Sequence, residues 1–433
     1  MDIVRDPQTL RALLDSRLDA GTRSVLGLAC AQATERGISL YLVGGSVRDL
    51  VLGRPSLDLD LAVEGDAMVL AQALAEATGA HVITHHDFGT ATVEGASWRL
   101  DLARTRAERY PRTGALPRVR PATIEDDLKR RDFAAHAVAL RLAPEPPALL
   151  DPFGGLADIE AGKLRVLHAR SFRDDPTRIL RLVRYVARFG WTIDPETDCL
   201  AQRDGRYLER VSGTRIAHEL MRTFAETHPE AALRALARYT AAARAASLAL
   251  DGREERIVAA FTTLRARLPQ PEPRHYLATL AAIDALAPGF AERVAPTAAE
   301  RKAIRDVPHV LEAARRYAIP AAIDAAALTT ALDKLDVAAV ASVAAALDAG
   351  AVSGWEADAA RFAARMLDRY LQEWRTLRPR LTGDDLQRLG IPRGPTMGAV
   401  LRMLRVARIR GEATTVEEEA RLAQTFARTR QQS

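Results

Sequence analysis

The feature that most constrains this chain is the run LYLVGGSVRDLVLGRPSLDLDLAVEGD at residues 40–66. The apolar segment 39–43 predicts a buried strand, and residues 46–52 predict a short helix that follows two glycines. Glycines let the backbone approach a ligand, and a helix start offers unpaired N–H groups and the positive end of the helix dipole. The pattern predicts a phosphate-binding turn with Arg48 within reach. A Gly-Gly turn alone is usually only a turn, and no Walker A sequence follows this one.

Two carboxylates follow this turn in the sequence DLDL. Residues i and i+2 of a strand point to the same face, so Asp58 and Asp60 are expected side by side. Adjacent carboxylates repel each other, and a divalent cation that prefers oxygen ligands removes the repulsion. A solvated strand edge is the alternative for an isolated DLD sequence. Beside a phosphate-binding turn the pair predicts a Mg²⁺ site for nucleotidyl transfer. Asp101, in the later run WRLDLAR, is either a third ligand or an ordinary strand residue in a salt bridge.

Two further segments are rich in arginine. Residues 104–131 hold nine Arg or Lys against four Asp or Glu, and proline and glycine in the first half predict a basic loop. Such a loop binds a polyanion, acts as a moving lid, or is an ordinary solvated surface loop. Residues 172–189 predict a helix capped by Asp174 or Asp175, with Pro176 in its first turn. Its arginines share one helical face, which is either solvated or a wall of a nucleotide site. They are Arg178, Arg181, Arg184 and Arg188.

The order of these patterns predicts the architecture. A length of 433 residues suggests two to four domains. Strand-like runs end before residue 145, so we expect an α/β head followed by an all-α remainder. The expected strands are residues 39–43, 57–63, 81–84, 89–94, 97–103 and 133–142, and the expected helices of the head are 7–36, 46–52 and 67–78. DPFGGLADI, at residues 151–159, is typical of a structural joint.

Composition limits the cellular compartment and the partners that can be expected. Cys30 and Cys199 have neither a CxxC nor a metal-binding spacing, which favours a reduced, cytoplasmic protein. No run approaches about 20 apolar residues, and the N-terminal sequence MDIVRDPQTL lacks the basic start and apolar core of a signal peptide. We therefore expect no membrane partner. The net charge of +5 permits an anionic partner without requiring one.

In this order the motifs resemble those of the class II CCA-adding enzyme and bacterial poly(A) polymerase family. The resemblance covers residues 40–224 and rests on LVGGSVRD, DLD, RRDF, DPFGGLADI, DDPTRILRLVRYVARFGW and ERVSGTRIAHEL. It implies a polymerase-β-like nucleotidyltransferase head at residues 1–148. It also implies a helical neck with a base-recognition helix at 149–270, and a helical body and tail that bind tRNA at 271–433.

The resemblance also implies roles for single residues. Asp58 and Asp60 match the catalytic residues that hold Mg²⁺. Nucleotide contacts are implied for Gly45, Arg48, Arg131, Asp132, Asp175, Arg178, Arg181 and Arg184. Among these, Asp175 and Arg178 match the pair that reads the incoming base. The chain departs from the family's usual RRDFTINAMA, because Ala134, Ala135 and His136 stand where Thr, Ile and Asn are usual.

Three functions compete at this stage. The leading one is a tRNA nucleotidyltransferase that adds CCA, or part of it, to the tRNA 3′ end from CTP and ATP. Enzymes that add only A or only CC are specialised forms of it, and a poly(A) polymerase is the runner-up. A catalytically idle RNA-binding protein is the third. The tail segment 381–411 resembles that of tRNA nucleotidyltransferases and carries arginines that suit an RNA backbone or a solvated helix: Arg393, Arg402, Arg405, Arg408 and Arg410. The oligomeric state stays open.

Overall fold

The computed structural model describes residues 3–55, 59–85, 89–320 and 322–431. Asp58 lies outside these residues, so only Asp60 of the DLD pair can be placed. The chain divides into two compact units. The first comprises Met1–Leu220 and Arg238–Ala246, and the second comprises Met221–Ala237 and Ser247–Ser433. The division into a head, a neck and a body with tail at residues 148 and 270 stays a prediction.

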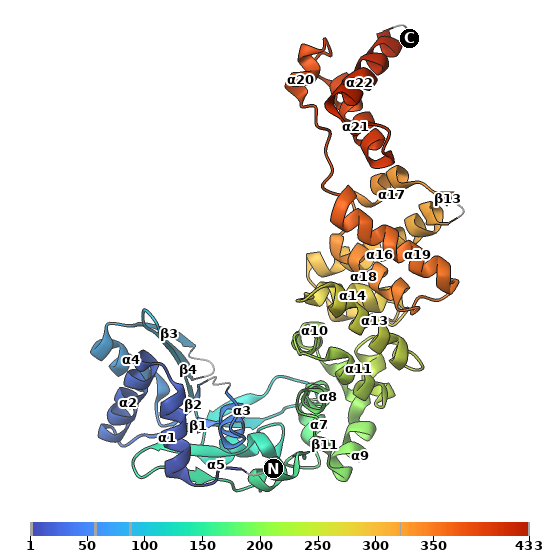
Figure 1. Cartoon of the computed structure of the whole chain (residues 1–433). Helices are drawn as coiled ribbons and strands as arrows, with labels where there is room; N and C mark the ends of the chain where they lie inside the picture. The colour runs from blue at the N-terminus through green and yellow to red at the C-terminus, as the bar shows by residue number, and fades with distance from the viewer. Residues whose placement is uncertain (1–2, 56–58, 86–88, 321, 432–433) are drawn as a thin grey trace. The chain divides into compact units, whose positions relative to one another are not determined.

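A seven-stranded sheet lies at the centre of the first unit, in the order β3-β4-β5-β2-β1-β8-β9 (Figure 1). Its strands are β1 (Ser39–Val43), β2 (Asp60–Glu64), β3 (His81–His85), β4 (Thr90–Glu94), β5 (Arg99–Arg104), β8 (Ala139–Ala143) and β9 (Ala148–Leu150). Strands β2 and β5 run parallel, and the other neighbours are antiparallel. Because β2 and β5 run parallel, Asp60, the first residue of β2, lies beside Asp101, the third residue of β5.

Helices cover the two faces of this sheet. They are α1 (Pro7–Arg17), α2 (Ala20–Glu35), α3 (Gly45–Val51), α4 (Ala67–Thr78) and α5 (Ile124–Lys129). Helices α2 and α4 lie side by side and pack against the sheet (Figure 1). An apolar cluster joins Tyr41 and Ala62 of the strands to Ile124 and Leu128 of α5. Because side chains alternate along a strand, Asp60 shares the face of Ala62 and lies at the open end of this cluster.

Most of the expected elements of the head are confirmed to within one or two residues, but two expectations are wrong. The helix expected at 7–36 is two helices, because Leu18 is extended and Asp19 caps a new helix by accepting from the Thr22 backbone N–H at 2.9 Å. The strand expected at 133–142 begins only at Ala139.

A buried 3₁₀ turn, η2 (Ala134–His136), stands in place of the first half of that strand. Helix α6 (Gly155–Ala161) packs against it. A Cβ on Gly155 would lie 2.1 Å from the Ala134 carbonyl oxygen, so the helix approaches closer than any other residue would permit. The second glycine of DPFGGLADI therefore has a structural role, as expected, and it seats η2 in the interior.

The basic segment 104–131 is an ordered hairpin followed by α5. Strand β6 (Arg106–Arg109) pairs with the antiparallel strand β7 (Arg118–Pro121). The sequence excluded a regular helix in the first half of this segment but did not reveal the strands. The tip of the hairpin, residues 110–117, reaches the helical part of the first unit, as described below.

Helices complete the first unit. They are α7 (Ser171–Asp174), α8 (Thr177–Phe189), α9 (Pro195–Asp204), η3 (Gly205–Arg210), α10 (Gly213–Phe224) and α12 (Thr240–Ala245), with a short parallel pair of β10 (Lys163–Leu164) and β11 (Thr192–Ile193). The last residues of α10, from Met221 onward, belong to the second unit. Asp175 caps α8, because its Oδ1 accepts from the Thr177 backbone N–H at 3.0 Å. The arginine face of α8 is not solvated as a whole, since Arg178 and Arg184 are buried.

The second unit is almost entirely helical. Its helices are α11 (Pro229–Ala237), α13 (Glu254–Arg267), α14 (Pro273–Ala282), α15 (Phe290–Val294), α16 (Ala298–Tyr317), α17 (Ala325–Leu332), α18 (Val337–Asp348), α19 (Ala357–Arg369), the π-helical turn η4 (Tyr370–Trp374), α20 (Gly383–Arg388), α21 (Pro395–Arg410) and α22 (Val416–Gln431). A two-residue pair, β12 (Ala318–Ile319) with β13 (Ala322–Ile323), is the exception. Among the described residues, no helix is both long and apolar enough to cross a bilayer.

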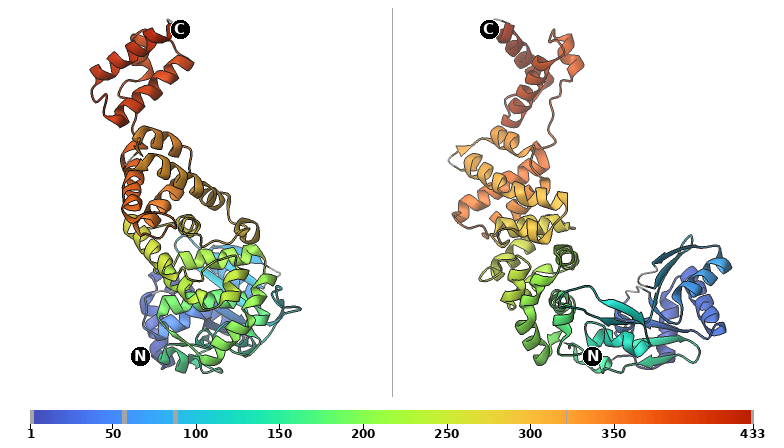
Figure 2. Two further views of the ribbon diagram at one scale, coloured as in Figure 1. Left: turned by 90° about the vertical axis from the view of Figure 1, so that its right-hand side faces the viewer. Right: turned by 180° about the vertical axis from the view of Figure 1, so that it is seen from behind.

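The last three helices form a small cluster, coloured red in Figure 2. Leu386, Ile391, Val400 and Leu404 form its apolar core. The five tail arginines divide into two kinds. Arg405 and Arg408 are largely buried and hold neighbouring backbone carbonyls, so they stabilise the fold. Arg393, Arg402 and Arg410 are exposed.

Candidate active site

The glycine turn, Gly44–Gly45, brings Arg131 next to Asp60. Gly44 has φ +73° and ψ −135°, a conformation that only glycine adopts readily. A Cβ there would lie 2.5 Å from Nη1 of Arg131 and 3.9 Å from Oδ2 of Asp60. The absence of this Cβ lets the guanidinium and the carboxylate converge on the turn. Arg131 is also held by Asp127 at 3.0 Å.

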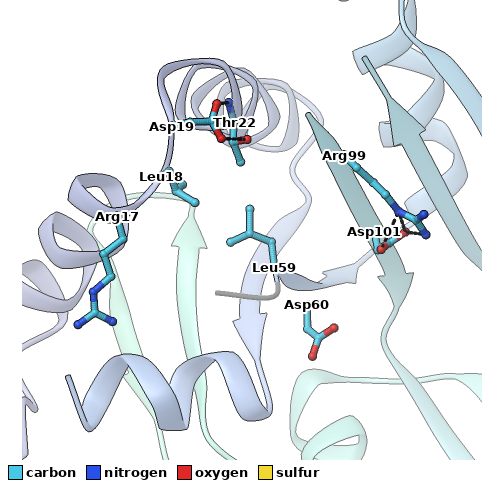
Figure 3. Close-up of a pocket in the computed structure, with 8 residues that line it drawn as sticks. All are labelled: Arg17, Leu18, Asp19, Thr22, Leu59, Asp60, Arg99 and Asp101. Carbon is cyan, nitrogen blue, oxygen red and sulfur yellow. Dashed lines mark hydrogen bonds and ion pairs between the residues drawn. The ribbon is translucent and has the colours of Figure 1, made fainter. Parts of the chain in front are cut away.

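Asp101 is the neighbour of Asp60 across the parallel pair β2–β5, where the two residues are in register. Figure 3 shows both side chains on adjacent strands, with the Arg99 guanidinium against Asp101. Asp101 accepts from Thr92 Oγ1 at 2.5 Å and from Arg99 Nη2 at 3.1 Å. Asp101 is thus a strand residue in a salt bridge, as one of the two interpretations expected, and its role as a third metal ligand stays a prediction.

The donor set around Asp60 suits a hard divalent cation. Adjacent strands lie about 5 Å apart, so in-register side chains on one face are neighbours, and Mg²⁺ and similar ions prefer carboxylate oxygens as ligands. The Arg99 pair is exposed and contributes little, so a cation could displace it. Two pockets border on both Asp60 and Asp101. One of them is also lined by Asp127, Arg130 and Arg131, which places positive charge opposite the carboxylates.

We expect Gly44→Ala to destabilise the first unit and to raise the KM for nucleotide. The forced conformation alone costs about 1–3 kcal/mol, and the added Cβ also displaces Arg131. Thermal unfolding and nucleotide-dependent kinetics measure the two effects. Gly79→Ala is the matched control, because Gly79 also has a positive φ, +69°, and no described atom lies within 4 Å of its added Cβ. A Gly44→Ala variant as active as Gly79→Ala would contradict the close packing of Arg131.

A buried network connects the helix after the glycine turn to α8. Arg48, only 3% exposed, pairs with Asp49 and donates from Nη1 to Nε2 of His136 at 2.5 Å. His136 Nδ1 lies 2.8 Å from Oδ1 of Asp132. Arg181 of α8 donates to the other carboxylate oxygen, Oδ2, at 2.8 Å. Arg48 and Asp132 are thus engaged with the protein, and their contacts with nucleotide stay predictions.

Glu219 of α10 extends this network. It lies 3.5 Å from Arg181 and 3.2 Å from Arg184. Burial by itself raises the pKa of the Asp132 carboxyl, but the charge of Arg181 and the hydrogen bonds from Arg181 and His136 outweigh it and hold that pKa well below its usual value. We use "buried network" for the seven side chains Arg48, Asp49, Asp132, His136, Arg181, Arg184 and Glu219.

The structure places Asp175 and Arg178 at the start of α8, each with protein partners. Arg178 is buried and donates to Ser171 Oγ at 2.7 Å and to the Arg130 carbonyl at 2.6 Å. Asp175 Oδ1 accepts from Arg215 Nη2 at 2.8 Å as well as from the helix start. Within the described residues, no hydrogen bond reaches Oδ2 of Asp175, which leaves that oxygen as an acceptor.

The hairpin tip lies against this same region. Arg215 donates from Nη1 to the Gly114 carbonyl at 3.1 Å, so one guanidinium holds both the tip and Asp175. Burial raises the pKa of the Tyr110 phenol. The charges of Arg178 and Asp175 are near enough to act on the same hydroxyl. The basic segment therefore meets the helix that carries the expected base-reading pair.

Sequence reasoning missed three of the residues that organise the site. Arg215 and Glu219 lie in ERVSGTRIAHEL, which was matched as a motif without assigned roles. His136 was noted only as a departure from the family's usual asparagine. The sequence did carry an indication, because a histidine three residues after the phenylalanine of RRDF stands among apolar residues and requires polar partners when buried.

Comparisons with known proteins identify the family of this chain. Residues 40–165 match the family described as "Poly A polymerase head domain", and residues 190–244 match "Probable RNA and SrmB- binding site of polymerase A". The A-adding tRNA nucleotidyltransferase of Halalkalibacterium halodurans is 32% identical over 403 residues, covering 91% of this chain and 90% of that protein.

Two other relatives differ in their products. A CC-adding tRNA nucleotidyltransferase of Deinococcus radiodurans is 42% identical over 199 residues, covering 46% of this chain and 53% of that protein. The solved structure of a Thermotoga maritima CCA-adding enzyme complexed with tRNA has a TM-score of 0.73 at 26% identity, and the match covers 98% of this chain and 99% of that one. The chain therefore belongs to the class II tRNA nucleotidyltransferase and poly(A) polymerase family, and it is a nucleotidyltransferase of the tRNA CCA-adding class.

Proposed function

We propose that the protein adds all or part of CCA to the tRNA 3′ end from CTP and ATP, without a nucleic-acid template and with release of pyrophosphate. The observation that carries this proposal is the pairing of Asp60 with Asp101 beside the glycine turn and Arg131. The same unit holds Asp175 and Arg178 at the start of one helix, which is what a base-reading device requires.

In this proposal Asp58 and Asp60 hold Mg²⁺, with Asp101 as a further ligand. When bound there, Mg²⁺ would hold the triphosphate, activate the attacking 3′-hydroxyl and stabilise the leaving pyrophosphate. Arg131 supports the same site with positive charge. Its Nε is buried, and no described residue accepts a hydrogen bond from it, so the atom suits a phosphate oxygen. Gly45 would place a backbone N–H at the helix start against the triphosphate.

Asp175 and Arg178 would choose the base by hydrogen bonding. C and A each present an exocyclic amine next to a ring-nitrogen acceptor. The Oδ2 of Asp175 would accept from the amine, and Arg178 would donate to the ring nitrogen. G and U present a carbonyl and a ring N–H instead, so both contacts fail. Each unpaired group in a closed pocket costs about 1–3 kcal/mol. Arg178 would have to exchange a present partner, Ser171 or the Arg130 carbonyl, for the base.

We expect Arg178→Ala and Asp175→Asn to lower addition of C and A and to increase misincorporation of U and G. Losing one mismatch penalty of about 1–3 kcal/mol corresponds to roughly 5- to 150-fold less discrimination. Single-nucleotide incorporation assays with each NTP measure this. Asp175→Asn keeps an oxygen that can cap α8, whereas Asp175→Ala also loses the cap, at a cost of about 1 kcal/mol. If all three variants keep the wild-type nucleotide preference, the pair is only a cap and a packed arginine.

Addition of A alone is the second candidate function. It is favoured by similarity over 91% of the chain to an A-adding enzyme, whereas the similarity to the CC-adding enzyme covers 46%. We also propose that the second unit contacts the body of the tRNA, with the exposed Arg393 and Arg402 against its phosphates. The domain division at residues 148 and 270 is part of the same proposal.

One assay distinguishes the candidates. Purified protein is supplied with tRNA that ends at the discriminator base, at C or at CC, and with one NTP at a time. A full CCA-adding enzyme uses CTP on the first two substrates and ATP on the third. An A-adding enzyme uses only ATP on tRNA ending in CC, a CC-adding enzyme uses only CTP, and a poly(A) polymerase extends any of them with many A residues. No incorporation in any combination would refute the proposal.

A further inference from the structure

The centre of the buried network is a histidine whose protonation state can be assigned from its partners. A guanidinium has only donors, so His136 Nε2 must accept the hydrogen bond from Arg48 Nη1 at 2.5 Å. The proton of a neutral imidazole then lies on Nδ1, which donates to Oδ1 of Asp132 at 2.8 Å. Oδ1 of Asp132 also accepts from the Phe133 backbone N–H at 2.9 Å, which holds the carboxylate in place.

The charge balance of the buried network leads to the same state. It contains three arginines and three carboxylates, which cancel. A protonated His136 would add one uncompensated charge to a site where the imidazole is 4% exposed. Burying an unbalanced charge is costly, so the network favours the neutral form.

The charged groups on the elements packed around His136 are consistent with a neutral imidazole. The charged groups that face His136 are Arg48 with its partner Asp49 from α3, Asp132 from the segment before η2, and Arg181 from α8. The Tyr185 ring of α8 packs edge-on at 4.6 Å. Helix α6 and strand β10 also pack on η2, and their Asp158 and Lys163 pair with each other at 3.3 Å. Burial lowers the pKa of His136. Asp132 acts in the opposite direction, and the charges of Arg48 and Arg181 offset part of its effect.

We propose that His136 is a neutral positioning residue that joins the phosphate-binding turn to the base-reading helix. It does so by accepting from Arg48 and donating to Asp132, which in turn fixes Arg181. The inference rests on the proposed nucleotide addition. It assigns His136 no contact with the nucleotide. It explains how a chain without the family's usual asparagine at this position keeps both ends of the site aligned.

The chemistry of this role singles out one conservative replacement. A side chain in this place must accept one hydrogen bond and donate another while it stays uncharged. Asparagine meets that requirement through its amide, although with a shorter reach, and alanine does not. An amide does not titrate between pH 5 and 8, whereas an imidazole does. On acidification, a proton on Nε2 would oppose the Arg48 guanidinium and break the connection.

The first test is nuclear magnetic resonance of ¹⁵N-histidine-labelled protein, with the His136 signal assigned from its loss in His136→Asn. The proposal requires a neutral ring at pH 7 with the proton on Nδ1, which keeps the pKa of His136 below the usual value of a histidine. A ring that is charged at pH 7, or that carries its proton on Nε2, overturns the proposal. This readout does not depend on enzymatic activity.

The second test is the pH–rate profile of nucleotide addition for the wild type, His136→Asn, His136→Ala and the exposed control His228→Asn. We expect kcat/KM of His136→Ala to fall about 10- to 100-fold at pH 7.5, with substantial rescue in His136→Asn. Wild type and the control should lose activity on acidification through a step that His136→Asn lacks. Profiles of the same shape in wild type and His136→Asn overturn the inference. If the wild type adds no nucleotide at any pH, the proposed function fails, and the spectroscopic result still decides the state of His136.

Discussion

Replacement of Asp60 by alanine should lower the rate of nucleotide addition by at least about 10³-fold, because a lost metal ligand removes several kcal/mol of transition-state stabilisation. Asp60 is in register with Asp101 and lies beside the glycine turn, whereas the other carboxylate of β2, Glu64, is at the opposite end of the strand and accepts from the Tyr41 hydroxyl at 3.0 Å. Steady-state incorporation of ATP and CTP measures the effect. Binding of tRNA, measured separately by filter retention, should change little.

The control for this prediction removes a carboxylate elsewhere in the same unit. The control is Glu76→Gln. Glu76 lies on the exposed side of α4, where its carboxylate accepts a hydrogen bond from the Gln72 side chain. The substitution should leave the rate within twofold of wild type, since surface substitutions of this kind have small effects. A folded Asp60→Ala protein with a rate near that of Glu76→Gln would exclude the metal site at this edge of the sheet.

Replacement of Asp132 by alanine should cost the first unit about 3–5 kcal/mol of unfolding free energy, because it removes the buried carboxylate closest to the partly buried Arg181. For a unit of this size that corresponds to a fall of roughly 6–20 °C in its unfolding transition. Calorimetry of the full chain resolves the transition of the first unit from that of the second. Nucleotide addition should fall as well, since the buried network spans both ends of the site.

A double variant separates lost charge balance from lost packing. In Asp132→Ala/Arg181→Ala the uncompensated cation is gone, so the destabilisation should be smaller than the sum of the two single variants. Glu160→Ala is the exposed control, because its ion pair with Arg5 is half-exposed on both sides and should contribute about 0–1 kcal/mol. Additive single effects would mean that Asp132 and Arg181 are not coupled.

Some elements of the head were predictable from local sequence, and others were not. β1, α3, α4, β4 and β5 were expected because their hydrophobic periods and their Gly, Asp and Pro boundaries are local properties. The register of Asp60 with Asp101 could not be expected, because pairing of strands about 40 residues apart depends on the whole sheet. The hairpin of residues 106–121 was missed for a related reason. Its strands are short, charged and lack an apolar alternation.

The candidate site divides in the same way. The glycine turn, the DLD pair, the RRDF motif and the arginine helix each lie in a contiguous run, so the reaction class and the residues that could carry it were predictable before the fold was known. Which charged side chains meet depends on how the elements pack. Arg48, expected at phosphate, is engaged with His136 and Asp49. Arg178 and Arg184 are buried, on a helical face that was expected to be either solvated or a wall of a nucleotide site. The physical reason is that a buried charge needs a partner, and that partner comes from whichever element packs nearby, not from its neighbours in the sequence.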